Sequence, residues 1–158
     1  MEIGSPPARR SAACALRCSN EAPRQARGFT RAVLGHWGVT GQAEYEIRVI
    51  VSELVTNSVV HSASESTSLT ITLLGRTVCL EVRDTGTWRE HKPDPSGERG
   101  RGLSLVRQQA TTSGVQRTLD GTRAWAQRVL TDDELPHQPR SDETQDQRGG
   151  RDDGGGTS

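Results

Sequence analysis

The stretch ELVTNSVVHS, residues 53–62, combines an apolar helical pattern with a polar stripe. The apolar residues of this region recur at helical spacing, at Ile47, Ile50, Val51, Leu54, Val55 and Val59. Glu53, Asn57 and His61 are spaced at i, i+4, so one helix face carries a carboxylate, an amide and an imidazole. A solvated polar stripe would explain this pattern. A site for Mg²⁺ and phosphate would also explain it, because Mg²⁺ prefers oxygen ligands and keeps several waters.

The segments around this stretch predict an α+β fold. Apolar periodicity predicts helices over residues 22–36 and 42–61, and a further helix that begins near Gly102. Alternating residues predict strands, which cover residues 12–17, 68–74, 78–84, 115–119 and 122–130. Gly75-Arg76 and Asp120-Gly121 predict hairpin turns within the two later strand pairs. Because the later strands come in consecutive pairs, we expect a two-layer sandwich with a mostly antiparallel mixed sheet and helices on one face.

The sequence RDTG, residues 83–86, closes one of the predicted strands. An ordinary turn of the Asp-x-Gly type would explain it. The functional alternative is a buried carboxylate, Asp84, that accepts a hydrogen bond from an amino group such as the exocyclic amine of adenine. A glycine at position 86 would then let a flat ring approach the backbone.

The sequence GERGRGLSLV, residues 97–106, is a glycine-rich segment that opens a predicted helix. It is either a flexible loop with a helix start or a phosphate site formed by backbone N–H groups at a helix N-terminus. No Gly-Lys-Ser/Thr follows, so it is not a Walker A loop. It does not directly follow a strand, which argues against a dinucleotide fingerprint.

Taken in order, these three motifs resemble the N box and the two glycine boxes of the Bergerat-type (GHKL) ATP-binding fold, which histidine kinases and gyrase-type ATPases share. The likeness covers residues 12–130 and includes the late strand GTRAWAQ, residues 121–127. It is closest to the bacterial anti-sigma-factor serine kinases. This resemblance implies a protein serine/threonine kinase that uses ATP and Mg²⁺. Its partner would be an anti-sigma-factor antagonist, with a sigma factor as the alternative.

The resemblance also assigns roles to individual residues. Asn57 would hold Mg²⁺, and Glu53 would act as general base toward the serine of the partner. Asp84 would receive the adenine amine, with Gly86 beside the base.

Further positions would contact the phosphates or enclose the adenine. Gly100 and Gly102, with Arg101 between them, would cradle the phosphates. Thr122 matches a position that closes the far side of the adenine site in relatives. His61 matches a position near the phosphates, although an ordinary helix-end histidine is an equal alternative.

Several features distinguish this chain from other branches of the fold. The first glycine box reads DTGTW, with Trp88 in place of a second glycine. The expected lid, Thr87 to Arg99, is short, as in the anti-sigma branch. His36 precedes Trp37 rather than an acidic residue, which argues against a sensor histidine kinase, and the tail is too polar to supply a gyrase-type transducer domain. A binding switch that holds ATP or ADP without phosphotransfer stays open, as does a fold without nucleotide.

The 158 residues suggest one globular domain with polar ends. We expect a flexible N-terminus over residues 1–11, an ATP-binding domain over residues 12–130, and a disordered, acidic, Gly-rich tail over residues 131–158.

The formal net charge of zero gives no reason to expect direct nucleic-acid binding. No apolar run is long enough to span a membrane, and no signal peptide is evident, so we expect a cytoplasmic protein without membrane association. The spacing of Cys14, Cys18 and Cys79 favours reduced thiols over a zinc site. A homodimer, common among relatives, stays open.

Overall fold

A computed structural model of the chain describes residues 6–86 and 101–137, with only the backbone described for residues 101–104. The elements follow in the order β1 (Arg9–Arg17), α1 (Ala22–Trp37), α2 (Gly41–His61), β2 (Ser66–Leu74), β3 (Thr77–Asp84), α3 (Arg101–Gln109), β4 (Thr112–Thr118), β5 (Gly121–Val129) and a short 3₁₀ helix, η1 (Asp132–Glu134). The order from β1 to β5 is the one that the sequence predicts, whereas η1 was not predicted. No helix in these described parts is both long and apolar enough to cross a lipid bilayer.

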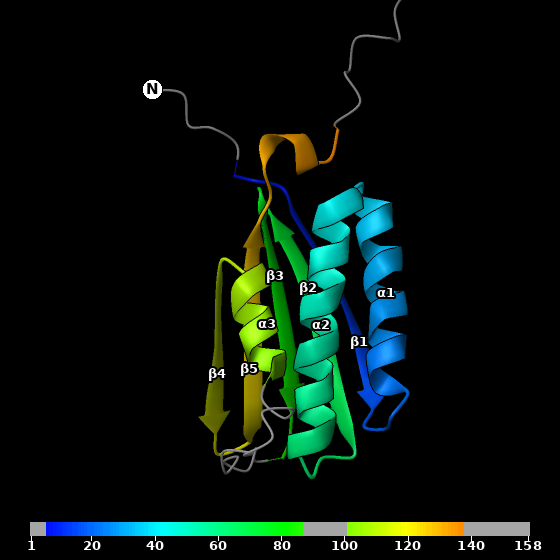
Figure 1. The fold of residues 1–158 in the computed structure, drawn as a ribbon, viewed down its shortest axis with the longest axis vertical. Helices are drawn as coiled ribbons and strands as arrows, with labels where there is room; N and C mark the ends of the chain where they lie inside the picture. Colours follow the sequence, from blue (N-terminus) through cyan, green and yellow to red (C-terminus); the bar gives the residue numbers. More distant parts are fainter. Residues whose placement is uncertain (1–5, 87–100, 138–158) are drawn as a thin grey trace, which may run out of the picture.

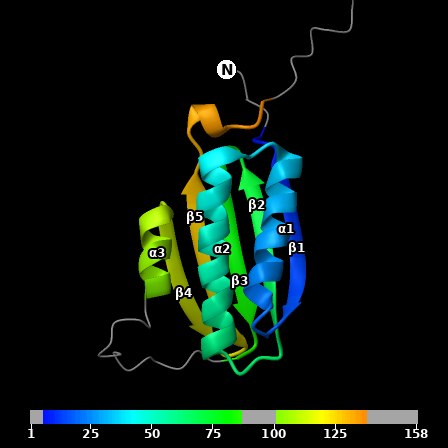
Figure 2. The same ribbon diagram turned by 45° about the vertical axis from the view of Figure 1, so that its right-hand side comes forward.

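The strands form one sheet in the order β1-β2-β3-β5-β4, and the three longer helices lie together on one of its faces (Figures 1 and 2). The predicted two-layer α+β sandwich is therefore confirmed. Every neighbouring pair of the described strands is antiparallel. We expected a mostly antiparallel sheet with some parallel pairing, and the described sheet has no parallel pair.

The core lies between the sheet and the helices because both layers place apolar side chains at matching intervals. In β2 and β3 every second residue is buried, which is the period of a strand with one face on a core. The centre of the sheet meets α2, whose inward residues are Ala43, Ile47, Ile50, Val51, Leu54, Val55 and Ser58. Six of these seven are apolar, and Ser58 is the one polar residue among them.

The chain ends of the folded region extend beyond the predicted boundaries. Strand β1 begins at Arg9, which pairs with Leu74, so part of the N-terminal segment predicted as flexible lies in the sheet. At the other end, η1 folds within the segment predicted as disordered tail. The three cysteines are free thiols, and burial raises the pKa of each.

An ion triad holds η1 against the rest of the molecule. The Arg128 guanidinium donates to Glu46 Oε2 at 2.8 Å and to Glu134 Oε1 at 2.9 Å, which joins β5 to both α2 and η1. The side chain of Arg128 is 11% exposed, and those of both acids are 18% exposed. Hydrogen bonds from Arg128 lower the pKa of Glu134 to about 2. The sequence offered no signal for this contact, because 82 residues separate Glu46 from Arg128.

This triad predicts an acid-sensitive contribution to stability. A carboxyl with a lowered folded-state pKa stabilises the fold above its unfolded pKa of 4.5, and this stability is lost as the pH falls toward about 2. Discounted for solvent screening, Glu134→Gln should lower the free energy of unfolding at pH 7 by about 1–2 kcal/mol. Urea unfolding at pH 7 and pH 3 measures the free energy of unfolding of the parent and of the variant. The difference between the two proteins should be smaller at pH 3 than at pH 7.

Asp133→Asn is the matched control, because this exposed neighbour makes no ion pair in the described part of the chain. An equal loss of stability in both variants would contradict the role given to the triad.

Candidate functional site

Asp84 ends β3 as a buried carboxylate, with 7% of its surface exposed. Burying a charge is costly unless hydrogen bonds compensate for the lost water. Ser58 Oγ donates to Asp84 Oδ2 at 2.7 Å, and the Gly86 N–H donates to Asp84 Oδ1 at 3.0 Å. Asp84 is thus held in place by α2 and by its own turn, as an acceptor for an amino group would need to be.

Ser58 was missed as a site residue, although a signal was present. It follows Asn57 directly and occupies a core-facing position of α2, where a polar side chain needs a hydrogen-bond partner. That partner is Asp84, so the bond ties the middle of the N-box segment to the end of β3. The buried bond also explains why the apolar stripe of α2 ends in a serine.

The threonines on either side of Asp84 in the sheet are buried as well. Thr67 and Thr122 pair with Asp84 from β2 and β5 and are 1% and 2% exposed. Thr122 Oγ1 donates to the Gly86 carbonyl at 3.1 Å, and Thr67 Oγ1 donates to the Arg83 carbonyl at 2.9 Å. Thr122, predicted to close the adenine site, therefore lies beside Asp84 and supports the turn that follows it.

Gly86 is required by packing within the protein. A Cβ at this position would lie 2.2 Å from Ser62 Oγ and 2.9 Å from the Ala63 nitrogen, and backbone atoms cannot yield easily. The turn after β3 thus packs directly on the segment that follows α2. The predicted position of Gly86 beside a nucleotide base is a separate prediction, and this packing contact does not bear on it.

Gly121 is a second glycine that the site requires, and it was predicted only as part of a hairpin turn. Its φ is 144°, in a region that favours glycine, and a Cβ would lie 1.9 Å from the Asp84 carbonyl oxygen. The absence of a side chain lets the start of β5 approach the end of β3.

Gly121→Ala should lower the free energy of unfolding by more than about 2 kcal/mol, because it adds both a clash and an unfavourable φ. Gly28→Ala is the control, since Gly28 lies in α1 with open space around its Cα. There alanine should raise stability by about 0.4–1 kcal/mol. Chemical denaturation measures both, and a Gly121→Ala variant as stable as the parent would contradict the close approach.

The polar stripe of α2 lies on the half-buried side of the helix. Glu53, Asn57 and His61 are each intermediate in exposure. Asn57 Nδ2 is buried, and among the described residues it has no hydrogen-bond partner. Because the two ends of an amide are assigned from their partners, this buried end can equally present the oxygen to a ligand. The amide is therefore suited to hold a cation through its oxygen.

An ion at Asn57 would need most of its ligands from elsewhere. Within residues 6–86 and 101–137, no three His, Cys, Asp or Glu side chains are grouped so that they could hold a metal. Mg²⁺ is usually bound through one or two protein oxygens, with substrate phosphates and water completing its shell. The amide of Asn57, with its buried end and no partner among the described residues, fits one such ligand.

The expected phosphate loop lies only partly within the described residues. Arg101 and Gly102 form the start of α3, where the first N–H groups of a helix have no partner within the helix and attract anions. Helix α3 lies beside α2 (Figure 2). Gly100, Trp88 and the predicted lid fall outside the described residues.

A buried carboxylate at a strand end, next to a helix with an orphaned amide, is an arrangement suited to a nucleotide-binding protein. Residues 16–128 match the family described as the histidine kinase-like ATPase domain. The chain belongs to this family. The match confirms the predicted relationship to the GHKL fold, and an ATPase domain implies that the nucleotide is ATP.

A solved structure with low sequence identity supports the fold. The crystal structure of the RsbU and RsbW domains of Rv1364c from Mycobacterium tuberculosis superposes with a TM-score of 0.64 at 19% identity. The superposition covers 82% of this chain and 35% of that one, so this chain spans about a third of its solved relative. The histidine kinase domain of the blue-light activated kinase from Erythrobacter litoralis EL346 gives a TM-score of 0.46 at 18% identity, over 73% and 65% of the two chains. The comparison with curated proteins gave no match.

Proposed function

We propose that this protein is an ATP-dependent serine/threonine kinase of the anti-sigma-factor type, which phosphorylates an anti-sigma-factor antagonist. The observation that supports it best is the Ser58–Asp84 hydrogen bond of 2.7 Å, because it joins the N-box helix to the carboxylate proposed to read adenine. ATP recognition and phosphoryl chemistry would then share one rigid frame of α2 and β3. The choice of an anti-sigma partner comes from the sequence motifs.

In this proposal each residue has one task. Asp84 accepts the adenine amine, Asn57 holds Mg²⁺, and Glu53, one helical turn before Asn57, accepts the proton of the attacking serine hydroxyl. When bound, Mg²⁺·ATP supplies the phosphoryl group and neutralises part of its charge. The start of α3 binds phosphate oxygens through Arg101 and Gly102. Positioning supplies most of the rate, as is usual for phosphoryl transfer.

Asn57→Ala should weaken binding of ATP in the presence of Mg²⁺ at least about tenfold, because it removes the proposed metal ligand. In EDTA the variant and the parent should bind ATP equally weakly. Isothermal titration calorimetry with and without Mg²⁺ measures all four affinities, and Asn20→Ala, at an exposed position before α1, is the control. A Mg²⁺ effect of unchanged size in Asn57→Ala would remove Asn57 from the metal site.

A second candidate is a binding switch that holds ATP or ADP and a regulatory partner without transferring phosphate. The sequence feature that favours it is Trp88, which stands where the family often has a second glycine in its first glycine box. Both candidates require the nucleotide site, and they differ in the fate of the γ-phosphate.

Incubation with γ-labelled ATP and purified anti-sigma-factor antagonists encoded by the same genome separates the two candidates. A kinase transfers label to a serine or threonine of one antagonist, and this transfer requires Mg²⁺. A binding switch forms a nucleotide-dependent complex with the partner and leaves it unlabelled. Neither label nor complex with any antagonist would reject the anti-sigma assignment.

A further inference from the structure

The two outer edges of the sheet differ in how they are protected. A free strand edge presents unpaired backbone groups, and proteins usually guard it with charged residues or proline. Strand β1 carries Arg9, Arg10 and Arg17 along its length. Strand β4, of sequence TSGVQRT, has a single charged residue, Arg117, and no proline. Within the described residues, β4 is therefore the edge with the weaker protection against an added strand.

The helix layer leaves β4 largely uncovered. Most residues of β4 are exposed, whereas most of its neighbour β5 is buried or half-buried. Val115, which pairs with the buried Ala124 of β5 and so faces the helix layer, is 41% exposed. The exposed valine leaves apolar surface in water on the β4 side of the gap between α3 and β4.

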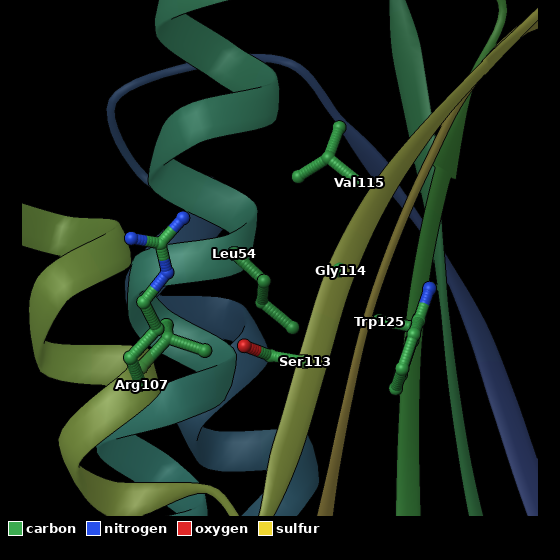
Figure 3. A pocket seen from close by; sticks show the side chains of 7 residues that line it. Leu54, Arg107, Ser113, Gly114, Val115 and Trp125 are labelled. Carbon is green, nitrogen blue, oxygen red and sulfur yellow. The ribbon is translucent and has the colours of Figure 1, made fainter.

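A pocket of about 270 Å³ lies in this gap (Figure 3). Its lining residues come from α2, α3, β4 and β5: Leu54, Val106, Arg107, Ser113, Gly114, Val115 and Trp125. Sites for drug-sized ligands usually range from about 300 to 1,000 Å³, so this volume suits one or two side chains better than a whole ligand. Among the described residues, none of those proposed for the nucleotide site lines this pocket.

The charged residue that lines the pocket is Arg107. Helix α3 and strand β4 contain no acidic residue, and Arg107 lines the pocket from α3 as an exposed side chain. In the described part of the chain Arg107 has no ion-pair partner. An occupant that supplies a carboxylate would complement this rim. A second copy of the chain would bring another β4 and α3 without acidic residues, and so would not.

We propose that the β4 edge binds an extended segment of a partner protein, which adds a strand to the sheet and places an apolar side chain in this pocket with an acidic side chain beside Arg107. Strand addition supplies main-chain hydrogen bonds, and pockets for alternate side chains supply specificity. Because strand side chains alternate, the apolar and acidic residues of the partner are two positions apart. The β4 edge would thus be a protein-binding site in addition to the proposed nucleotide site.

The test uses the ¹⁵N-labelled full chain and the capped peptide Thr-Glu-Thr-Leu-Thr-Glu-Thr, in which leucine and both glutamates share one face. Amide resonances of residues 105–107 and 112–118 should shift on titration, and the peptide with lysine in place of glutamate should bind at least tenfold more weakly. Arg107→Glu should reverse this preference. Absence of shifts in residues 112–118 at millimolar peptide, or equal binding of both peptides, would overturn the proposal.

Val115→Lys places a charge at the pocket and should abolish binding. Val129→Lys is the matched control, because Val129 is a strand residue with 40% exposure that does not line the pocket. Sedimentation of the chain without peptide tests whether a second copy of the chain binds the β4 edge instead. A dimer that Val115→Lys dissociates, together with no peptide binding, would assign the edge to a second copy and reject the partner segment.

Discussion

Asp84→Asn should remove the preference of this protein for ATP over purine riboside 5′-triphosphate, a nucleotide that lacks only the exocyclic amine. The buried carboxylate is held by Ser58 and the Gly86 N–H in the position of an acceptor. A hydrogen bond to a charged group contributes about 1.5–3 kcal/mol, so the parent should prefer ATP by roughly 10- to 150-fold. In the variant the two nucleotides should bind within about threefold of each other.

The comparison of two nucleotides isolates the adenine contact from general damage to the fold. Asp84→Asn also disturbs the bonds to Ser58 and Gly86, so the absolute affinity for ATP should fall as well. Ser58→Ala serves as the control, because it removes one support of the carboxylate and leaves the carboxylate in place. This variant should keep most of the preference for ATP. A parent protein that binds both nucleotides equally would show that Asp84 does not read the amine.

Glu53→Gln should lower phosphotransfer to the partner by about 10²–10⁴-fold and leave ATP affinity within about twofold of the parent. The amide keeps the size and hydrogen-bonding capacity of the side chain and cannot accept the proton of the serine hydroxyl. Calorimetry measures the affinity, and single-turnover transfer of labelled phosphate measures the chemical step. Glu65→Gln, at an exposed position after α2, is the matched control.

A loss of transfer with unchanged binding would mark an interaction made only in the transition state. Transfer at the parental rate in Glu53→Gln would exclude it as the base. A large loss of ATP affinity would instead give Glu53 a role in the ground-state complex.

The elements were predictable because their signals are local. The apolar stripe of residues 47–59 predicted α2. The alternation of buried and outward residues predicted β2 and β3, with a hairpin turn at Gly75 between them. The boundaries were less accurate where long-range contacts extend an element. Strand β1 continues to Arg9 because its ladder with β2 does, and η1 folds because Arg128 binds Glu134.

In the candidate site, sequence patterns found the residues with conspicuous chemistry and missed those that position them. Asp84 and Thr122 were predicted separately, and the pairing of β3 with β5 places them side by side. Ser58 was missed because a serine in the apolar stripe of α2 indicates a buried hydrogen bond but not its partner, Asp84, which lies 26 residues away. Gly121 was predicted only as a turn residue, because its close contact with the Asp84 carbonyl exists only in the folded sheet.

The central claim is that this chain binds ATP together with Mg²⁺, and calorimetric titration of the parent protein tests it most directly. We predict saturable binding of about one ATP per chain in the presence of Mg²⁺, weakened at least about tenfold when EDTA removes the metal. A folded protein that shows no detectable heat of ATP binding at millimolar ATP, with or without Mg²⁺, would contradict the claim.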